Sequence, residues 1–145
     1  MDSIFRAQQV WTYSSPGGSS SSSKILEQFS ITTGMHIILA IGRSRDERVA
    51  DQWTGSHPFE HGRLFDDEYD WVTNLIRMAN ENPETFILYR PHPRRFPNRR
   101  ELKTDSSVHE LLGHVSSRNP PDNFRVNLPD DQVSVFDLMR VADVV

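Results

Sequence analysis

The segment ETFILYRPHPRRFPNRR, residues 84–100, contains the clearest strand signal of the chain and its densest positive charge. A short, continuous apolar run such as TFILYR (85–90) is typical of a strand that is buried on both faces of a parallel sheet. The run HIILAI (36–41), which is followed by Gly42, has the same character. These two runs predict a parallel sheet in an α/β fold.

Helical patterns alternate with the strand signals. Residues 66–83 place apolar side chains at helical spacing, begin with acidic residues that suit the helix dipole and end at Asn-Pro. Weaker signals follow in turn: a helix over 106–115, a strand over 124–128, a helix over 134–142 and the start of a strand over 143–145. The resulting β-α-β-α-β-α-β order predicts a doubly wound parallel sheet, because strands that alternate with helices are joined by right-handed crossovers.

A Ser- and Gly-rich segment, SSPGGSSSSSK (14–24), predicts a flexible linker. It separates a short head, residues 1–13, from one domain over residues 25–145. The head is either a disordered N-terminus or the end of a preceding element. We expect the domain to be incomplete at its carboxyl end, because the sequence stops where a strand begins.

Composition limits the function. The chain has 145 residues, a formal net charge of −4 and no cysteine. A negative chain is a poor candidate for nucleic-acid binding, and the lack of cysteine excludes a disulfide framework and a thiolate metal site. No apolar run approaches the roughly 20 residues that span a bilayer, and the N-terminus does not resemble a signal peptide. We therefore expect a cytoplasmic protein without a metal site.

The basic segment follows the strand at 85–90 directly, where ligands bind in parallel α/β sheets. Arg90 and Arg94 carry guanidinium groups that suit phosphate oxygens, and His92 lies between them. Pro91 and Pro93 stiffen the backbone on either side of His92. This combination predicts a phosphate-binding loop. The alternative is a solvated basic loop that only balances the acidic start of the first predicted helix.

A second candidate loop, GRSRDERVADQW (42–53), follows the strand at 36–41. Ser44 and the backbone amides after it are expected to cap a helix, whose N-terminus would attract an anion. Asp46 and Glu47 are either first-turn acids of that helix or contacts for a substrate hydroxyl. In the basic segment after the strand at 85–90, Arg95 is a further candidate for binding phosphate. Neither a Gly-x-Gly-x-x-Gly motif nor a P-loop is present.

These motifs, in this order, resemble the carboxyl-terminal nucleotide-binding half of capsule polysaccharide biosynthesis proteins, which are glycosyltransferases with two Rossmann-like domains. The resemblance covers about residues 34–145. It rests on the segments GRSRDERVADQW, DWVTNLI, FILYRPHPR and FRVNLPDDQVSVFDLMRVADVV.

The resemblance implies a transferase that moves a sugar from a nucleotide-activated donor to a polysaccharide or glycolipid acceptor. Arg90 and His92 would hold the donor phosphate, with help from Arg94 and Ser44, and no cofactor is expected. The resemblance assigns no catalytic residue here, since the catalytic base of such enzymes usually lies in the other domain. The chain alone is therefore expected to be inactive. Peripheral association with an export complex at the inner face of the cytoplasmic membrane is also implied.

Two alternatives stay open. The same segments occur in similar form in polyol-phosphate transferases and, more loosely, in nucleotide-sugar epimerases. A non-catalytic α/β domain that binds nucleotides or other anions would also explain the basic loop.

Overall fold

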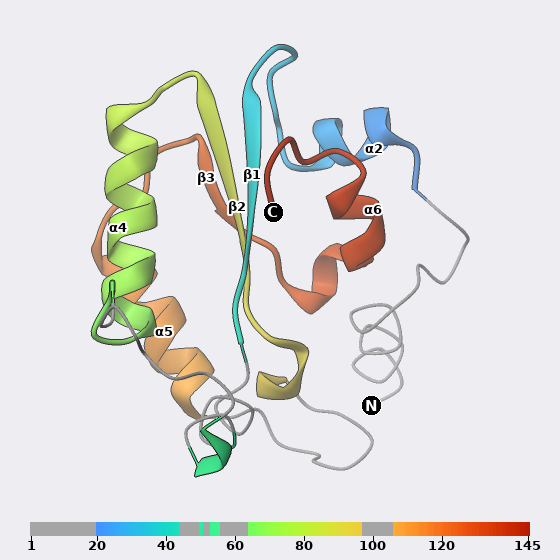
Figure 1. Ribbon diagram of the computed structural model, residues 1–145. Helices are drawn as coiled ribbons and strands as arrows, with labels where there is room; N and C mark the ends of the chain where they lie inside the picture. The colour runs from blue at the N-terminus through green and yellow to red at the C-terminus, as the bar shows by residue number, and fades with distance from the viewer. Residues whose placement is uncertain (1–19, 44–49, 51–52, 56–63, 97–105) are drawn as a thin grey trace.

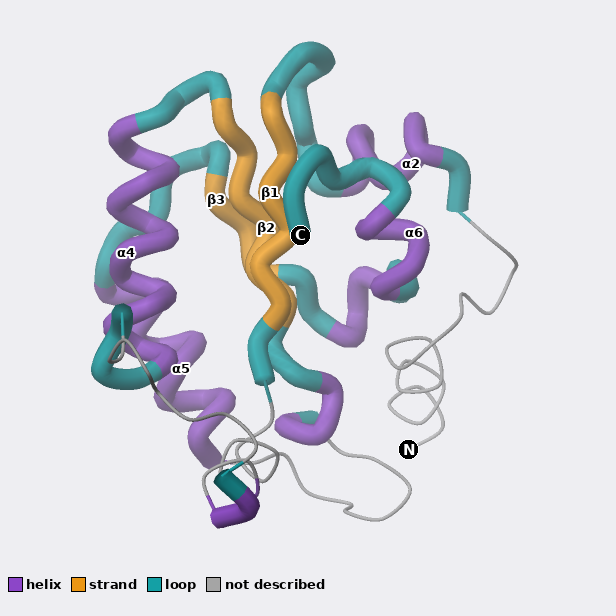
Figure 2. The backbone as a smooth tube through the Cα atoms, in the orientation of Figure 1, coloured by secondary structure: helices purple, strands orange, loops and turns teal. Residues whose placement is uncertain are grey.

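The computed structural model describes residues 20–43, 50, 53–55, 64–96 and 106–145. Within these residues the chain is an α/β protein in which a small parallel sheet lies between two layers of helices (Figures 1 and 2). None of the helices in these ranges is both long and apolar enough to cross a bilayer.

The sheet contains three parallel strands in the order β1-β2-β3. β1 (His36–Ile41) and β2 (Thr85–Arg90) have the bounds that the sequence predicts, and they pair over their whole lengths. β3 (Phe124–Val126) is two residues shorter than predicted and pairs with Ile87, Leu88 and Tyr89 of β2. The strand directions place the carboxyl ends of β1 and β2 side by side.

Two helices cover each face of the sheet (Figure 1). α4 (Glu68–Glu81) and α5 (Ser106–Ser117) cover one face, and α2 (Ser22–Gln28) and α6 (Val135–Met139) cover the other. The strands therefore need apolar side chains on both faces, which explains their continuous apolar sequences. Two hydrophobic cores result, one on each face.

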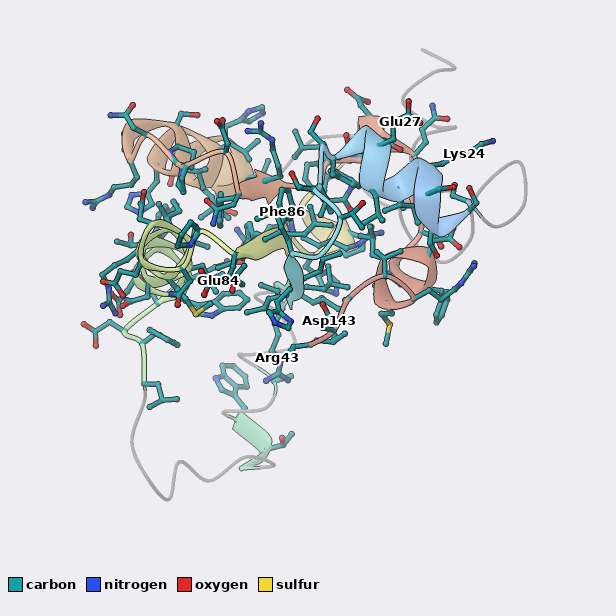
Figure 3. The ribbon with its side chains drawn as sticks, turned by 90° about the horizontal axis from the view of Figure 1, so that it is seen from above. Lys24, Glu27, Arg43, Glu84, Phe86 and Asp143 are labelled. Carbon is teal, nitrogen blue, oxygen red and sulfur yellow. The ribbon has the colours of Figure 1, made fainter. Side chains whose placement is uncertain are left out.

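β2 supplies side chains to both cores in strict alternation. Ile87 and Tyr89 pack in the core beneath α4 and α5, whereas Phe86 and Leu88 pack in the core beneath α2 and α6. Figure 3, which views the molecule from above, shows Phe86 between the two helical layers. Full burial of a side chain of this size stabilises the fold by roughly 1.5–3 kcal/mol.

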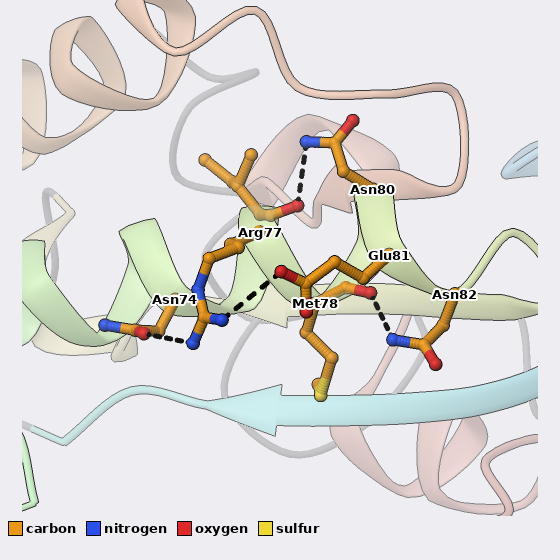
Figure 4. Close-up of polar contacts among 7 residues, drawn as sticks. Asn74, Arg77, Met78, Asn80, Glu81 and Asn82 are labelled. Atoms are coloured by element: carbon orange, nitrogen blue, oxygen red, sulfur yellow. Dashed lines mark hydrogen bonds and ion pairs between the residues drawn. The ribbon is translucent and has the colours of Figure 1, made fainter.

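α4 confirms the strongest helix prediction, although it is shorter than the predicted range of 66–83. Asp67 caps its N-terminus by accepting a hydrogen bond from the Asp70 N–H at 2.9 Å. Figure 4 shows the exposed side near its other end, where Arg77 forms an ion pair with Glu81 at 3.3 Å. Asn82 ends the helix, and its side chain donates to the carbonyl of Met78 at 2.7 Å.

The predicted fourth strand is present only as a single bridge. Val144 pairs with Ile38 in parallel orientation, on the side of β1 opposite β2. The N–H of Leu39 donates to the carbonyl of Val144 at 2.9 Å, and Asp143 accepts a hydrogen bond from the Ile37 N–H at 2.7 Å. The structure therefore does not confirm the fourth strand of the predicted order, because too few residues pair here to form a strand.

Two helices, α6 and α2, also differ from the prediction. α6 covers only 135–139 of the predicted 134–142, although Ser134 caps it as expected by accepting from the Asp137 N–H at 3.1 Å. α2 was not predicted. It begins at Ser22, so residues 22–24 of the predicted linker form its first turn. The predicted head, residues 1–13, lies outside the described residues.

Candidate functional site

The loops that follow β1 and β2 meet at Gly42. The Gly42 N–H donates to the carbonyl of Arg90 at 2.8 Å, which extends the pairing of the two strands by one residue. A Cβ atom at this position would lie 3.3 Å from the backbone nitrogen of His92 and 2.9 Å from Oε1 of Glu68. A larger residue at position 42 would therefore force these neighbours to shift, and the two strand ends meet in one small region at the carboxyl edge of the sheet.

Arg90, the last residue of β2, turns into the protein. Its side chain is only 1% exposed, and it lies on the same side of the strand as Phe86 and Leu88. Nη1 donates to Oδ1 of Asn127 at 2.6 Å and to the carbonyl of Val133 at 3.0 Å. Burial lowers the pKa of Arg90 to about 10, a value at which the side chain stays protonated at neutral pH.

A polar network continues from Arg90 into the turn that follows β3. Asn127, which is fully buried, donates from Nδ2 to Oδ2 of Asp131 at 2.9 Å. The same carboxylate oxygen accepts from the N–H of Leu128 at 2.7 Å. Burial raises the pKa of Asp131, and the hydrogen bonds from Leu128 and Asn127 oppose that shift. The network ties the end of β2 to the turn η2 (Pro129–Asp131).

Tyr89, the preceding residue of β2, turns to the opposite side. Its hydroxyl donates to Oε1 of Glu68, the first residue of α4, at 2.6 Å. The other oxygen, Oε2, pairs with the guanidinium of Arg95. Burial and the neighbouring Glu68 carboxylate raise the pKa of Tyr89, so that its hydroxyl remains a hydrogen-bond donor. The ring of Trp71 packs edge to face on Tyr89, with the ring centroids 5.7 Å apart.

The basic loop itself forms a compact turn, η1 (Pro93–Arg95). The N–H of Arg95 donates to the carbonyl of His92 at 3.1 Å, and the N–H of Phe96 donates to the first carbonyl of the turn at 3.1 Å. Phe96 is buried against Val108 of α5. The described part of the loop is therefore held by the buried Arg90 on one side and by Phe96 on the other, and half-buried His92 lies between them.

The structure brings only part of the predicted site together. Arg90 ends β2, and His92 and Arg95 follow it in the basic loop. Arg90 and Arg95 nevertheless point to opposite faces of the sheet, and both have protein partners. The sequence prediction assumed that Arg90 and His92 face a ligand together, whereas Arg90 is buried. The remaining predicted positions lie outside the described residues: the side chain of Arg94, and all of Ser44, Asp46 and Glu47.

Four residues of this region were not assigned to the site from the sequence. Glu68 was interpreted only as an acid at the start of a helix. For Asp131, a loop or cap role was preferred over a place at the ligand edge. Tyr89 and Asn127 interrupt otherwise apolar runs, TFILYR and FRVNL, and this is the signal that marks them. A polar side chain within a buried strand usually has a hydrogen-bond partner, so each predicts a contact without naming it.

No group of three His, Asp or Glu side chains within the described ranges lies close enough together to hold a metal ion. Comparisons with protein-family models, with curated proteins and with solved structures gave no significant match to the chain. The functional argument therefore rests on the residues and their geometry.

Proposed function

We propose that this chain is the donor-binding part of a glycosyltransferase of capsule or surface polysaccharide biosynthesis, with a Rossmann-like half-fold. It binds the phosphate of a nucleotide-activated sugar at the carboxyl edge of the sheet. The observation that carries the proposal is the meeting of two strand ends at Gly42, beside the backbone of His92. Ligands of parallel α/β sheets bind at this edge, and the basic loop begins there.

The candidate residues of the two loops have different roles in the proposal. His92 donates a hydrogen bond to the donor phosphate, and Arg94 and Ser44 assist. In the transfer, an acceptor hydroxyl oxygen forms a bond to the anomeric carbon of the sugar and gives its proton to a base outside this chain. The bond between that carbon and the phosphate oxygen breaks, and negative charge develops on the leaving nucleotide. Basic side chains and backbone N–H groups aimed at that charge stabilise the transition state. Arg90 supports the loop from inside the protein, through Asn127 and Val133.

The proposal includes the setting of the reaction. The acceptor is a growing polysaccharide or a glycolipid, and the enzyme works in the cytoplasm, in peripheral contact with an export complex at the membrane. A polyol-phosphate donor or a nucleotide-sugar epimerase reaction would use the same phosphate site.

Binding of UDP, CDP and inorganic pyrophosphate to the full chain, measured by calorimetry, tests the proposal. We expect a nucleoside diphosphate to bind more tightly than pyrophosphate, and His92→Ala to weaken that binding by about tenfold, the value of one hydrogen bond to a charged group. His109→Ala, on the exposed side of α5, is the matched control and is expected to change nothing. Equal affinity for pyrophosphate and nucleotides would favour a general anion-binding domain. Unchanged binding in His92→Ala would contradict the proposed site.

A further inference from the structure

The carboxylate of Glu68 joins three parts of the chain at the edge of the sheet. We propose that Glu68 is a positioning residue of the phosphate site, which holds the basic loop in place and keeps Arg95 away from the ligand. The inference rests on the proposed function, because it concerns the geometry of that same site.

Both carboxylate oxygens of Glu68 have a partner. Oε1 accepts from the Tyr89 hydroxyl of β2 at 2.6 Å, and Oε2 pairs with Arg95 of the turn η1. The side chains of Glu68 and Arg95 are only 11% and 10% exposed. A pair so shielded is screened little by salt, and its charge-assisted hydrogen bond fixes direction as well as distance. The start of α4, the end of β2 and the basic loop are therefore held by one side chain.

Glu68 also borders the loop after β1. A Cβ atom on Gly42 would lie 2.9 Å from Oε1, so the carboxylate occupies the space directly beneath the meeting point of the two loops. His92 lies three residues before Arg95 and contributes the carbonyl that accepts from the Arg95 N–H. Release of Arg95 would therefore free the turn that contains the backbone of His92.

Two possible roles of Glu68 predict opposite changes in anion affinity when the residue is replaced by glutamine. If its charge acted on the ligand only through the electric field, then Glu68→Gln would tighten anion binding, because a negative charge disappears and Arg95 becomes available. If Glu68 positions the loop, then Glu68→Gln weakens binding, because the turn loses its charged anchor. The inference predicts the second result.

The experiment is a UDP titration of the full chain, comparing Glu68→Gln with Glu110→Gln. Glu110 is the matched control, since it accepts from the Tyr69 hydroxyl at 3.3 Å at an exposed contact between α4 and α5. We expect UDP to bind about tenfold more weakly to Glu68→Gln and equally well to Glu110→Gln. Unchanged or tighter binding in Glu68→Gln would overturn the inference.

Hydrogen exchange separates this inference from the proposed function. In Glu68→Gln the amides of Arg95 and Phe96 should exchange at least tenfold faster, while those of Leu88 in β2 keep their protection. Absence of UDP binding in the wild type would refute the proposed function, and exchange would still report whether Glu68 holds the loop. Unchanged exchange at Arg95 and Phe96 would refute that role.

A second variant covers the case in which Glu68→Gln does not fold. Tyr89→Phe removes one of the two contacts of Glu68 and keeps the ion pair with Arg95. We expect a smaller effect in the same direction, about threefold weaker UDP binding with faster exchange at Arg95. Tyr69→Phe, which removes the corresponding hydroxyl on the exposed contact with Glu110, is expected to leave both measurements unchanged. No difference between the two tyrosine variants would overturn the inference.

Discussion

Tyr89 and Arg90 are neighbours at the end of β2, yet they organise different parts of the protein. Tyr89 faces α4, where Glu68 connects it to Arg95 through an ion pair. Arg90 faces the layer of α2 and α6, where its charge meets the side-chain oxygen of Asn127 and a backbone carbonyl. One side is a largely buried ion pair, and on the other side a fully buried cation donates to neutral oxygens of Asn127 and Val133.

This difference changes the interpretation of the basic segment. Arg90 and Arg95 both bind protein groups, so the density of positive charge in the sequence overstates the charge available to a ligand. The two arginines instead fix the loop from both sides of the sheet. His92 lies between these two supports, and a ligand site built there would be held rigidly.

The largest loss of stability is expected when the buried contacts of Arg90 are removed. Arg90→Ala leaves the side chain of Asn127 and the carbonyl of Val133 without their donor and opens a cavity. We expect a loss of about 3–5 kcal/mol in the free energy of unfolding, measured by urea denaturation. Arg125→Ala, on β3 with 47% of its side chain exposed, should change it by less than about 0.5 kcal/mol.

The result for Arg90 also decides between the two interpretations of this residue. Loss of nucleotide binding at unchanged stability would mean that Arg90 contacts the ligand directly, as the sequence predicts. Loss of stability would mean that it supports the loop from within.

A smaller loss of stability is expected at Gly42, which follows β1 and lies beside Tyr89 and Glu68. Gly42→Ala places a Cβ atom 2.9 Å from Oε1 of Glu68 and 3.3 Å from the hydroxyl oxygen of Tyr89, so their hydrogen bond must shift. We expect a loss of about 1 kcal/mol by urea denaturation. The control is Gly113→Ala in α5, where nothing lies within 4 Å of the added carbon. Because alanine favours helices, this variant should be about 0.5–1 kcal/mol more stable than the wild type. Equal changes at both glycines would contradict the close approach at Gly42.

The smallest expected effect is a pH dependence of stability caused by Asp131, which Asn127 connects to Arg90. Burial raises the pKa of Asp131 above its ordinary value of 3.8, so the folded protein binds this proton more tightly than the unfolded chain does. The contribution of this group to stability therefore rises as the pH falls through the raised pKa toward 3.8. Relative to Asp131→Asn, the wild type should therefore gain stability between pH 7 and pH 4 in urea denaturation. If the stability of the two proteins changed with pH in the same way, the raised pKa of Asp131 would be contradicted.

The sequence predicts best those elements whose signal is local. β1 and β2 have the expected bounds because a continuous apolar run between polar segments leaves little choice of ends. α2 was missed because serine is a weak helix former, and the helix depends on the packing of Ile25 and Phe29 against the sheet. That packing involves residues far along the chain, so a local pattern does not show it.

The site illustrates the same limit. Arg90 is in phase with Phe86 and Leu88, and this alternation indicates which face of the sheet its side chain joins. Its partners, Asn127 and Val133, become apparent only from the pairing of β3 with β2. A buried polar residue is therefore easier to predict than the group that satisfies it.

The bridge at Val144 has a consequence for the order in which the protein folds. β1 is paired on one side by β2 and on the other by Val144, and both partners come later in the chain. Asp143 and Ile37, which hydrogen-bond beside this bridge, are 106 residues apart. Contacts of such sequence separation form late and slow folding, because a long loop must close before they contribute. During synthesis on a ribosome, the earliest strand of this sheet would therefore wait longest for its second neighbour, with one of its edges exposed to other chains until then.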